Sequence, residues 1–264
     1  MKRLPMQLFV WLMVVGFFCH ATDIDMSHFI ARQVRVDGHS YAYRVFLPAG
    51  WDRKRTWPVV LFLHGSGERG SDNSAPLSQG LPPWLGQHAA DFPAVVVIPQ
   101  APQDTFWYGT PEKMALAALE DSIEAFHGDR DRLYLTGLSM GGYGVWQIAV
   151  DHPGMFAAAA IVCGGLLPPT DSPELHLQGV PAGKNPYAWV AHRITPLPAW
   201  IFHGAADDIV PPQGSRDMYA ALKTQGDDVR YTEFPGVNHG SWVPAYATPE
   251  LWPWMFSHRR DRSR

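Results

Sequence analysis

The 264-residue chain is poor in charged residues and in cysteine, and each shortage excludes a class of protein. Only 17% of the residues are Asp, Glu, Lys or Arg, and the formal net charge is -4. This composition provides no strongly basic surface, so we do not expect nucleic acid as a partner. The twelve histidines form no H-E-x-x-H motif or comparable ligand cluster. We therefore expect no metal site and no other cofactor.

The N-terminal apolar run is also too short to cross a membrane. It extends over the 12 residues Leu8–Cys19, whereas a membrane-spanning helix needs about 20. Lys2 and Arg3 precede the run and Ala21 follows it. This arrangement predicts a secretory signal peptide over residues 1–21, so the mature protein would be secreted or periplasmic without stable insertion in a membrane.

Two other interpretations of this N-terminal segment are less consistent with its residues. A buried N-terminal helix is one, but a helix that packs against a globular domain usually keeps a polar face, and this run is apolar on every side. Lipidation of Cys19 would need small residues where Phe17 and Phe18 stand. Cleavage after Ala21 would leave Cys163 without an intrachain partner, and its position in an apolar run predicts a buried, inert thiol.

Apolar runs and helical patterns alternate along the rest of the chain. A β-hairpin is predicted first, because alternating runs flank an Asp37-Gly38 turn. The predicted strands that follow are 59–63, 94–98, 133–136, 157–162, 199–202 and 229–234, and the predicted helices are 112–126, 142–150, 187–191, 213–225 and 249–258. This order predicts an α/β fold with a mostly parallel, doubly wound sheet, helices on both faces and an N-terminal β-hairpin. A single catalytic domain is expected over residues 22–264.

The segment Gly137-Leu138-Ser139-Met140-Gly141 lies where a predicted strand meets a predicted helix. It fits the G-x-S-x-G pattern of a nucleophile elbow, a tight turn that holds the serine hydroxyl out of the sheet. The same pattern also fits an ordinary glycine-flanked turn. Ser139 is therefore a candidate nucleophile whose interpretation depends on finding partners.

A serine nucleophile needs a neighbouring base, and the base needs a group that orients it. Asp207 and His239 each follow a later predicted strand, and functional groups of an open parallel sheet gather at the carboxyl ends of its strands. Alone, Asp207 would fit a helix cap, although Asp208 is better placed for that role. Alone, His239 would fit a turn. The order Ser139, Asp207, His239 instead predicts a nucleophile, an acid and a base in one hydrolytic site.

The loop His64–Gly70 (HGSGERG) follows the first predicted parallel strand. Small residues there let a backbone N–H approach a developing oxyanion. Ser66 is the predicted donor and Gly67 the next candidate. Met140, directly after the candidate nucleophile, is the predicted second donor. His64 is interpreted as a residue that packs at the base of the loop.

Together these motifs resemble the α/β-hydrolase superfamily. The segments GLSMGG, HGAADDIVP and GVNHG are typical of the whole superfamily, whereas HGSGERG and the PQAP segment at 99–102 are more diagnostic. They resemble a group of secreted carboxylesterases and predicted peptidases allied to phospholipase/carboxylesterases and dienelactone-hydrolase-like proteins. The resemblance covers about residues 34–254. It implies the α/β-hydrolase fold, a Ser139-Asp207-His239 triad and an oxyanion hole built from Ser66 and Met140.

The resemblance also favours a function. Serine stands where dienelactone hydrolases have a cysteine nucleophile, which favours hydrolysis of ordinary small-molecule esters through an acyl-enzyme. A serine peptidase of the prolyl-oligopeptidase type is the alternative, but relatives that cut peptides usually carry a large N-terminal propeller for which there is no room ahead of Val34.

Three aromatic residues are candidates for the wall of a substrate pocket. Trp107, Tyr108 and Trp242 would suit an aryl- or carbohydrate-linked substrate, although large aromatics are often partly buried for packing alone. A non-catalytic, carbohydrate-binding or scaffold protein on the same fold would explain exposed tryptophans. It would not explain the ordered triad.

Overall fold

The computed structural model describes residues 26–226 and 228–260. The predicted signal peptide over residues 1–21 and Cys19 lie outside the described residues. In the described part of the chain, no helix has the length and apolar character needed to span a membrane.

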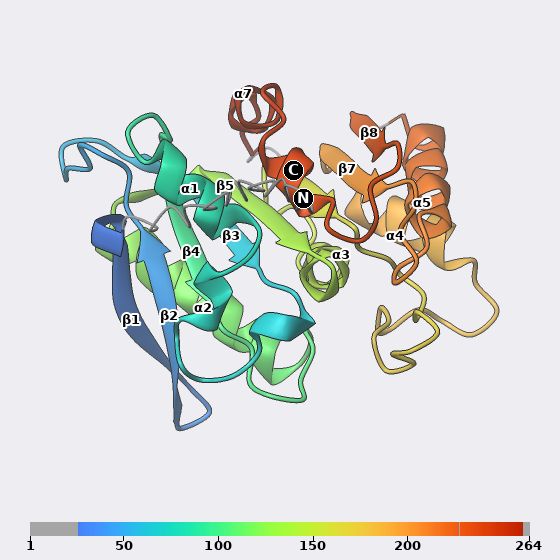
Figure 1. Cartoon of the computed structure of the whole chain (residues 1–264), viewed down its shortest axis with the longest axis horizontal. Helices are drawn as coiled ribbons and strands as arrows, with labels where there is room; N and C mark the ends of the chain where they lie inside the picture. Colours follow the sequence, from blue (N-terminus) through green and yellow to red (C-terminus); the bar gives the residue numbers. More distant parts are fainter. Residues whose placement is uncertain (1–25, 227, 261–264) are drawn as a thin grey trace, which may run out of the picture.

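One eight-stranded sheet with the order β1-β2-β4-β3-β5-β6-β7-β8 forms the centre of the described structure (Figure 1). β1 (Phe29–Val36) and β2 (His39–Phe46) form the predicted antiparallel hairpin, and β2 then pairs antiparallel with β4. The strands from β3 to β8 run parallel to one another. Their bounds are β3 (Trp57–Leu63), β4 (Val95–Pro99), β5 (Gly128–Leu138), β6 (Ala158–Val162), β7 (Ala199–Gly204) and β8 (Val229–Phe234). The predicted mostly parallel sheet is confirmed.

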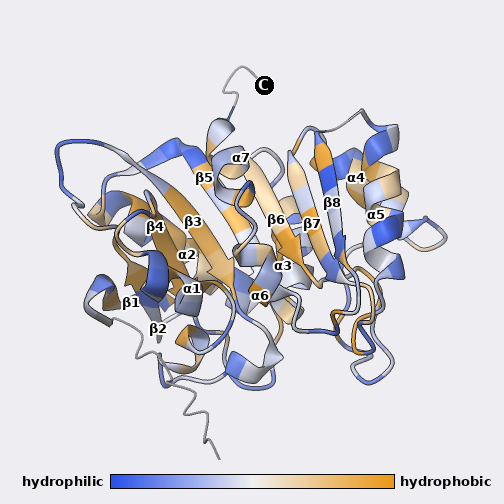
Figure 2. Ribbon diagram, turned by 45° about the horizontal axis from the view of Figure 1, so that its top comes forward, coloured by the Kyte–Doolittle hydropathy of each residue, from blue (hydrophilic) through white to orange (hydrophobic). Residues whose placement is uncertain are grey.

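Helices cover both faces of the sheet because side chains of the buried strands alternate between two apolar clusters. In β3, Leu61 and Leu63 enter one cluster, whereas Phe62 enters the other. Figure 2 shows hydrophobic residues concentrated in these central strands. One face carries α2 (Thr110–Ala125), α3 (Met140–Asp151), α4 (Pro186–Ile194) and α5 (Gln213–Thr224). The other face carries α1 (Leu81–His88), α6 (Trp242–Tyr246) and α7 (Leu251–Ser257).

Helices α1 and α6 and the short 3-10 turns were not predicted from sequence. α1 begins with Leu81-Pro82-Pro83, a composition that also fits a loop. α6 has only five residues and contains Pro244. The 3-10 turns are η1 (Met26–His28), η2 (Ser66–Glu68) and η3 (Ala75–Leu77). Such short elements show too little periodicity to be recognised, and tertiary packing stabilises them instead.

Candidate active site

Ser139 lies in a sharp turn between β5 and α3. Its backbone has φ 52° and ψ -120°, a conformation that residues other than glycine rarely adopt. The Ser139 N–H donates to the carbonyl of Val162 in β6 at 2.9 Å. A Cβ on Gly141 would lie 1.9 Å from the Leu63 oxygen, and one on Gly137 would lie 2.5 Å from the Gly141 oxygen. The glycines of the pattern are therefore required by close backbone approach.

The structure brings the side chains of Ser139, His239 and Asp207 together at the carboxyl ends of β5, β8 and β7. His239 Nε2 is 2.9 Å from Ser139 Oγ, and His239 Nδ1 is 2.8 Å from Asp207 Oδ2. A carboxylate only accepts hydrogen bonds, so Nδ1 carries the hydrogen and Nε2 is free to accept the serine proton. The side chain of His239 is 19% exposed and that of Asp207 is fully buried. A substrate can therefore approach from the side of the imidazole.

The Asp207 carboxylate accepts hydrogen bonds on both oxygens. Oδ1 accepts from the amides of Ile209 and Val210 at 3.0 and 2.9 Å. Oδ2 faces His239 and, at 3.2 Å, Nε2 of His203. Burial raises the pKa of Asp207, but the hydrogen bonds from His203, His239 and the Val210 amide outweigh it and hold this pKa well below its usual range. Because α5 begins only at Gln213, Asp207 does not cap that helix.

His203 is the residue of this site that sequence reasoning missed. It is fully buried at the end of β7 and lies four positions before Asp207. The sequence feature that could have identified it is a histidine at the end of an apolar strand, Ala199-Trp-Ile-Phe-His203. Buried polar side chains need hydrogen-bond partners; those of His203 are Ser215 and Val210, and Asp207 Oδ2 also lies 3.2 Å from its Nε2.

The two predicted oxyanion donors lie in the loop after β3 and in the elbow itself. Ser66 begins η2, and a Cβ on Gly65 before it would lie 3.7 Å from Ser139 Cβ. Met140 is the first residue of α3, where backbone N–H groups have no partner within the helix. Among the hydrogen bonds of the described residues, neither amide donates to an acceptor. Their role as oxyanion donors stays a prediction.

His64 and the PQAP segment hold the loop in place. His64 Nε2 accepts from the Ala101 amide at 3.0 Å, so Nδ1 carries the hydrogen and donates to the Gly65 oxygen at 2.6 Å. Gln100 Nε2 donates to the Glu68 oxygen at 3.0 Å. Burial lowers the pKa of His64 to about 4, so the ring is neutral at neutral pH. His64 thus packs at the base of the loop, as predicted.

Of the three predicted aromatic wall residues, the structure places Trp242 beside the triad, with its ring edge-on to His239 at 5.6 Å between centroids. The prediction for Trp107 is wrong, because its side chain is 1% exposed and its Nε1 donates to the His64 oxygen at 3.0 Å. Trp107 therefore braces the loop. Tyr108 stacks on Phe106 and lines a hollow of about 10 Å³, which is too small for a substrate group.

One group of described residues has the composition of a metal site. Potential ligand atoms of Cys163, Asp207 and His239 lie within 4.8 Å of one another. However, burial raises the pKa of the Cys163 thiol to about 12, and the other two side chains bond to each other. A metal ligand must be deprotonated, so this group is poorly suited to a metal.

Comparisons with known proteins find similarity to esterases and to a peptidase family. A model of the prolyl oligopeptidase family matches residues 184–253. The chain is 27% identical over 205 residues to a poly(3-hydroxyoctanoate) depolymerase of Pseudomonas fluorescens, which covers 70% of this chain and 69% of that protein. It is 24% identical over 186 residues to a probable feruloyl esterase C of Aspergillus terreus, covering 69% of this chain and 60% of that protein.

A solved thermostable esterase has a similar structure. Its TM-score is 0.72 at 30% identity, over 89% of this chain. The chain spans 64% of the length of that esterase.

The close approach at Gly141 leads to a stability prediction. Gly141→Ala places a Cβ against the Leu63 carbonyl, so α3 must move, and the free energy of unfolding should fall by about 3 kcal/mol. Urea unfolding measures the change. Gly240→Ala is the control, because a Cβ there meets nothing within 4 Å. Equal stability of the two variants would contradict the prediction.

The neutral ring of His64 leads to a pH prediction. The folded pKa of His64 is about 4, against an ordinary value of 6.5. Between these values the unfolded chain binds more protons, so stability falls as pH drops from about 6.5 to about 4 and levels off below. The loss should reach about 3 kcal/mol. His64→Gln should flatten this part of the curve, measured by urea unfolding at several pH values; an unchanged slope would contradict the prediction.

Proposed function

As a serine hydrolase of the α/β-hydrolase superfamily, this chain needs a nucleophile, a base and an acid, and we propose that Ser139, His239 and Asp207 supply them. The observation that carries the proposal is the continuous hydrogen-bonded line from Ser139 Oγ to His239 at 2.9 Å and from His239 to Asp207 at 2.8 Å. The reaction we propose is hydrolysis of a carboxylic ester through an acyl-enzyme.

In this mechanism Ser139 Oγ attacks the ester carbonyl while His239 Nε2 takes the hydroxyl proton. The amides of Ser66 and Met140 stabilise the resulting oxyanion. The imidazolium then gives its proton to the leaving alkoxide, and the carbonyl re-forms as an acyl-enzyme. A water molecule repeats the cycle and releases the acid. Asp207 stays ionised throughout, because its hydrogen-bond donors keep its pKa low.

Esters are proposed over amides because the similar depolymerase, feruloyl esterase and thermostable esterase all carry the names of ester-cleaving enzymes. The family match to prolyl oligopeptidases is confined to residues 184–253, and the peptidase alternative is not favoured. A non-catalytic scaffold is not favoured either, because the triad side chains are in hydrogen-bonding contact. We propose a secreted or periplasmic location from the N-terminal segment.

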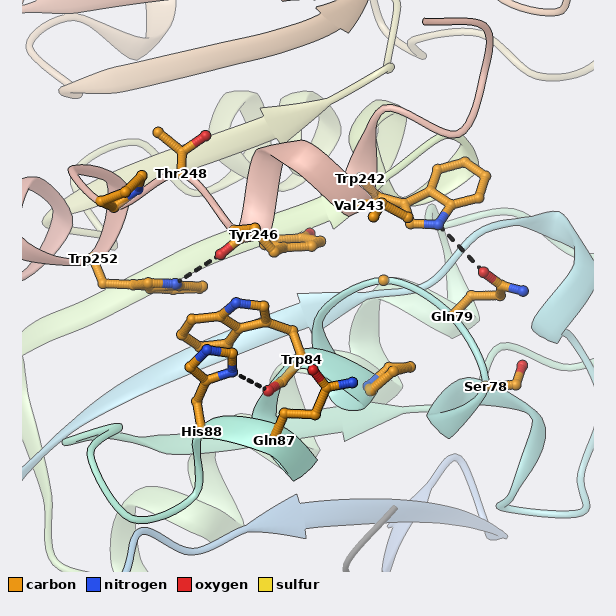
Figure 3. Close-up of a pocket in the computed structure, with 14 residues that line it drawn as sticks. Ser78, Gln79, Trp84, Gln87, His88, Trp242, Val243, Tyr246, Thr248 and Trp252 are labelled. Carbon is orange, nitrogen blue, oxygen red and sulfur yellow. Dashed lines mark hydrogen bonds between the residues drawn. The ribbon is translucent and has the colours of Figure 1, made fainter. Parts of the chain in front are cut away.

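A cavity of about 610 Å³ between α1 and α6 is the proposed site for part of the substrate. Figure 3 shows Trp84 of α1 across this cavity from Tyr246 and Trp242 of α6. The polar lining residues include Gln79 and Gln87, and none of the described residues that line the cavity is Asp, Glu, Lys or Arg. Such a lining suits a neutral ring, either aryl or carbohydrate.

The position of the cavity suggests which part of the substrate it takes. Trp242 both lines the cavity and contacts the ring of His239. In the proposed mechanism His239 gives its proton to the leaving alcohol. We therefore assign the cavity to the alcohol side of the ester.

Substitution of the triad tests the proposed reaction. Ser139→Ala should abolish turnover of p-nitrophenyl esters and labelling by a fluorophosphonate probe. Asp207→Asn should lower kcat by about 10⁴-fold, because the imidazole loses its orienting acceptor. Assays of feruloyl esters and peptide amides on the same protein separate esterase from peptidase. Equal labelling of Ser139→Ala and the unaltered protein would refute the nucleophile, and preferential amide cleavage would refute the esterase.

Substitution of Trp242 tests the cavity. In Trp242→Ala, kcat/KM should fall about tenfold more for an aryl or glycosyl ester than for the methyl ester of the same acid, because only the ring-bearing alcohol loses a stacking surface. If the ratio of the two kcat/KM values does not change, the cavity does not bind the alcohol side of the ester.

A further inference from the structure

His203 lies behind the proposed triad and contacts its acid. The side chains of both His203 and Asp207 are fully buried, with His203 Nε2 3.2 Å from Asp207 Oδ2. The same Nε2 is 2.8 Å from the carbonyl oxygen of Val210. Because both neighbours only accept hydrogen bonds, Nε2 must carry a hydrogen and donate it.

The hydrogen bond of this group goes to Val210, and the carboxylate oxygen that holds the proposed base lies slightly farther from the same Nε2, at 3.2 Å, where it can share the hydrogen. Asp207 Oδ2 accepts from His239 Nδ1 on one side and faces His203 Nε2 on the other. A hydrogen bond from His203 would therefore limit rotation of the carboxylate and offset part of the free-energy cost of burying its charge. A buried charged oxygen that loses a donor is costly.

His203 is itself fixed from two directions. Val210 accepts from His203 Nε2 through its carbonyl and donates its amide to Asp207 Oδ1, so the three residues form a closed ring of contacts. On its other side, His203 Nδ1 is 2.7 Å from Ser215 Oγ in α5. The imidazole thus connects the loop that carries Asp207 to the helix that follows it.

We infer that His203 is a positioning residue for the proposed reaction: it donates a hydrogen bond to Asp207 that holds the carboxylate in the orientation His239 requires. The inference rests on the proposed triad. His203 touches neither the reacting atoms nor the proposed cavity, so its removal should act on kcat and leave KM nearly unchanged.

Two substitutions of the same residue separate positioning from packing. In His203→Gln the side-chain amide reaches the place of Nε2 and can still donate to Asp207. In His203→Asn the shorter amide reaches the place of Nδ1, beside Ser215, and leaves Asp207 Oδ2 without that donor. Both variants keep a buried amide, so a simple packing role predicts similar kinetics for the two.

We expect His203→Asn to lower kcat for p-nitrophenyl acetate by about 10- to 100-fold, the rate equivalent of one hydrogen bond to a charged group. His203→Gln should recover most of that loss, and KM should change little in either. Ser215→Ala removes only the contact at Nδ1 and leaves the donor to Asp207 in place, so it should lower kcat much less than His203→Asn does. Melting temperatures and circular dichroism establish that each variant is folded.

Equal kcat values for folded His203→Gln and His203→Asn would overturn the inference. A raised KM with an unchanged kcat would overturn it too. If one of the pair does not fold, His203→Leu compared with Ser215→Ala takes its place, and equal kcat values there overturn it too. Ser139→Ala is measured alongside. Retained activity in Ser139→Ala refutes the proposed triad. If Ser139→Ala is inactive but the His203 variants keep the kcat of the unaltered protein, only the role of His203 is refuted.

Discussion

The contact between Gly141 and the end of β3 is the constraint on which the rest of the site depends. At this contact a Cβ would meet the Leu63 oxygen at 1.9 Å, so only glycine lets α3 begin so close to the sheet. The close start of α3 forces the turn at Ser139 into its unusual φ of 52°. It also places the loop after β3 next to the serine, because Leu63 leads directly into His64. One backbone contact therefore positions both the candidate nucleophile and the predicted oxyanion loop.

The strain at Ser139 is supported by hydrogen bonds and packing from the surrounding chain. The Ser139 amide is bound to β6, and a Cβ on Gly144 would meet Trp107 at 2.5 Å. Trp107 in turn donates to the carbonyl of His64. α3, the segment after β4 and the loop after β3 are thus packed as one unit. A strained residue can persist at a functional site when many surrounding contacts hold it in place.

The success of sequence reasoning varied with the kind of signal. β8 was predicted with its observed bounds, and the elbow was located, because strand composition and glycine spacing are local in sequence. Trp107 was misplaced because burial depends on α3 packing over it, which no local pattern records. His203 was missed for a related reason: its contacts with Asp207 and Ser215 exist only once β7 and α5 have packed. Strands and motifs that depend on neighbouring residues could be predicted, whereas contacts between segments distant in the sequence could not.

Burial and hydrogen bonds set the charge of several titratable groups near Ser139. Burial keeps His64 neutral and raises the pKa of Cys163 to about 12, while hydrogen bonds keep Asp207 ionised. The Asp207 carboxylate lies on the far side of His239 from Ser139, where it can stabilise the positive charge that the proposed mechanism places on the imidazole. In the proposed mechanism, the amides of Ser66 and Met140 meet the substrate oxygen. Negative charge that develops at a substrate oxygen would therefore be separated from Asp207 by a forming cation and met by preorganised donors, the arrangement that electrostatic stabilisation of an acyl-transfer transition state requires.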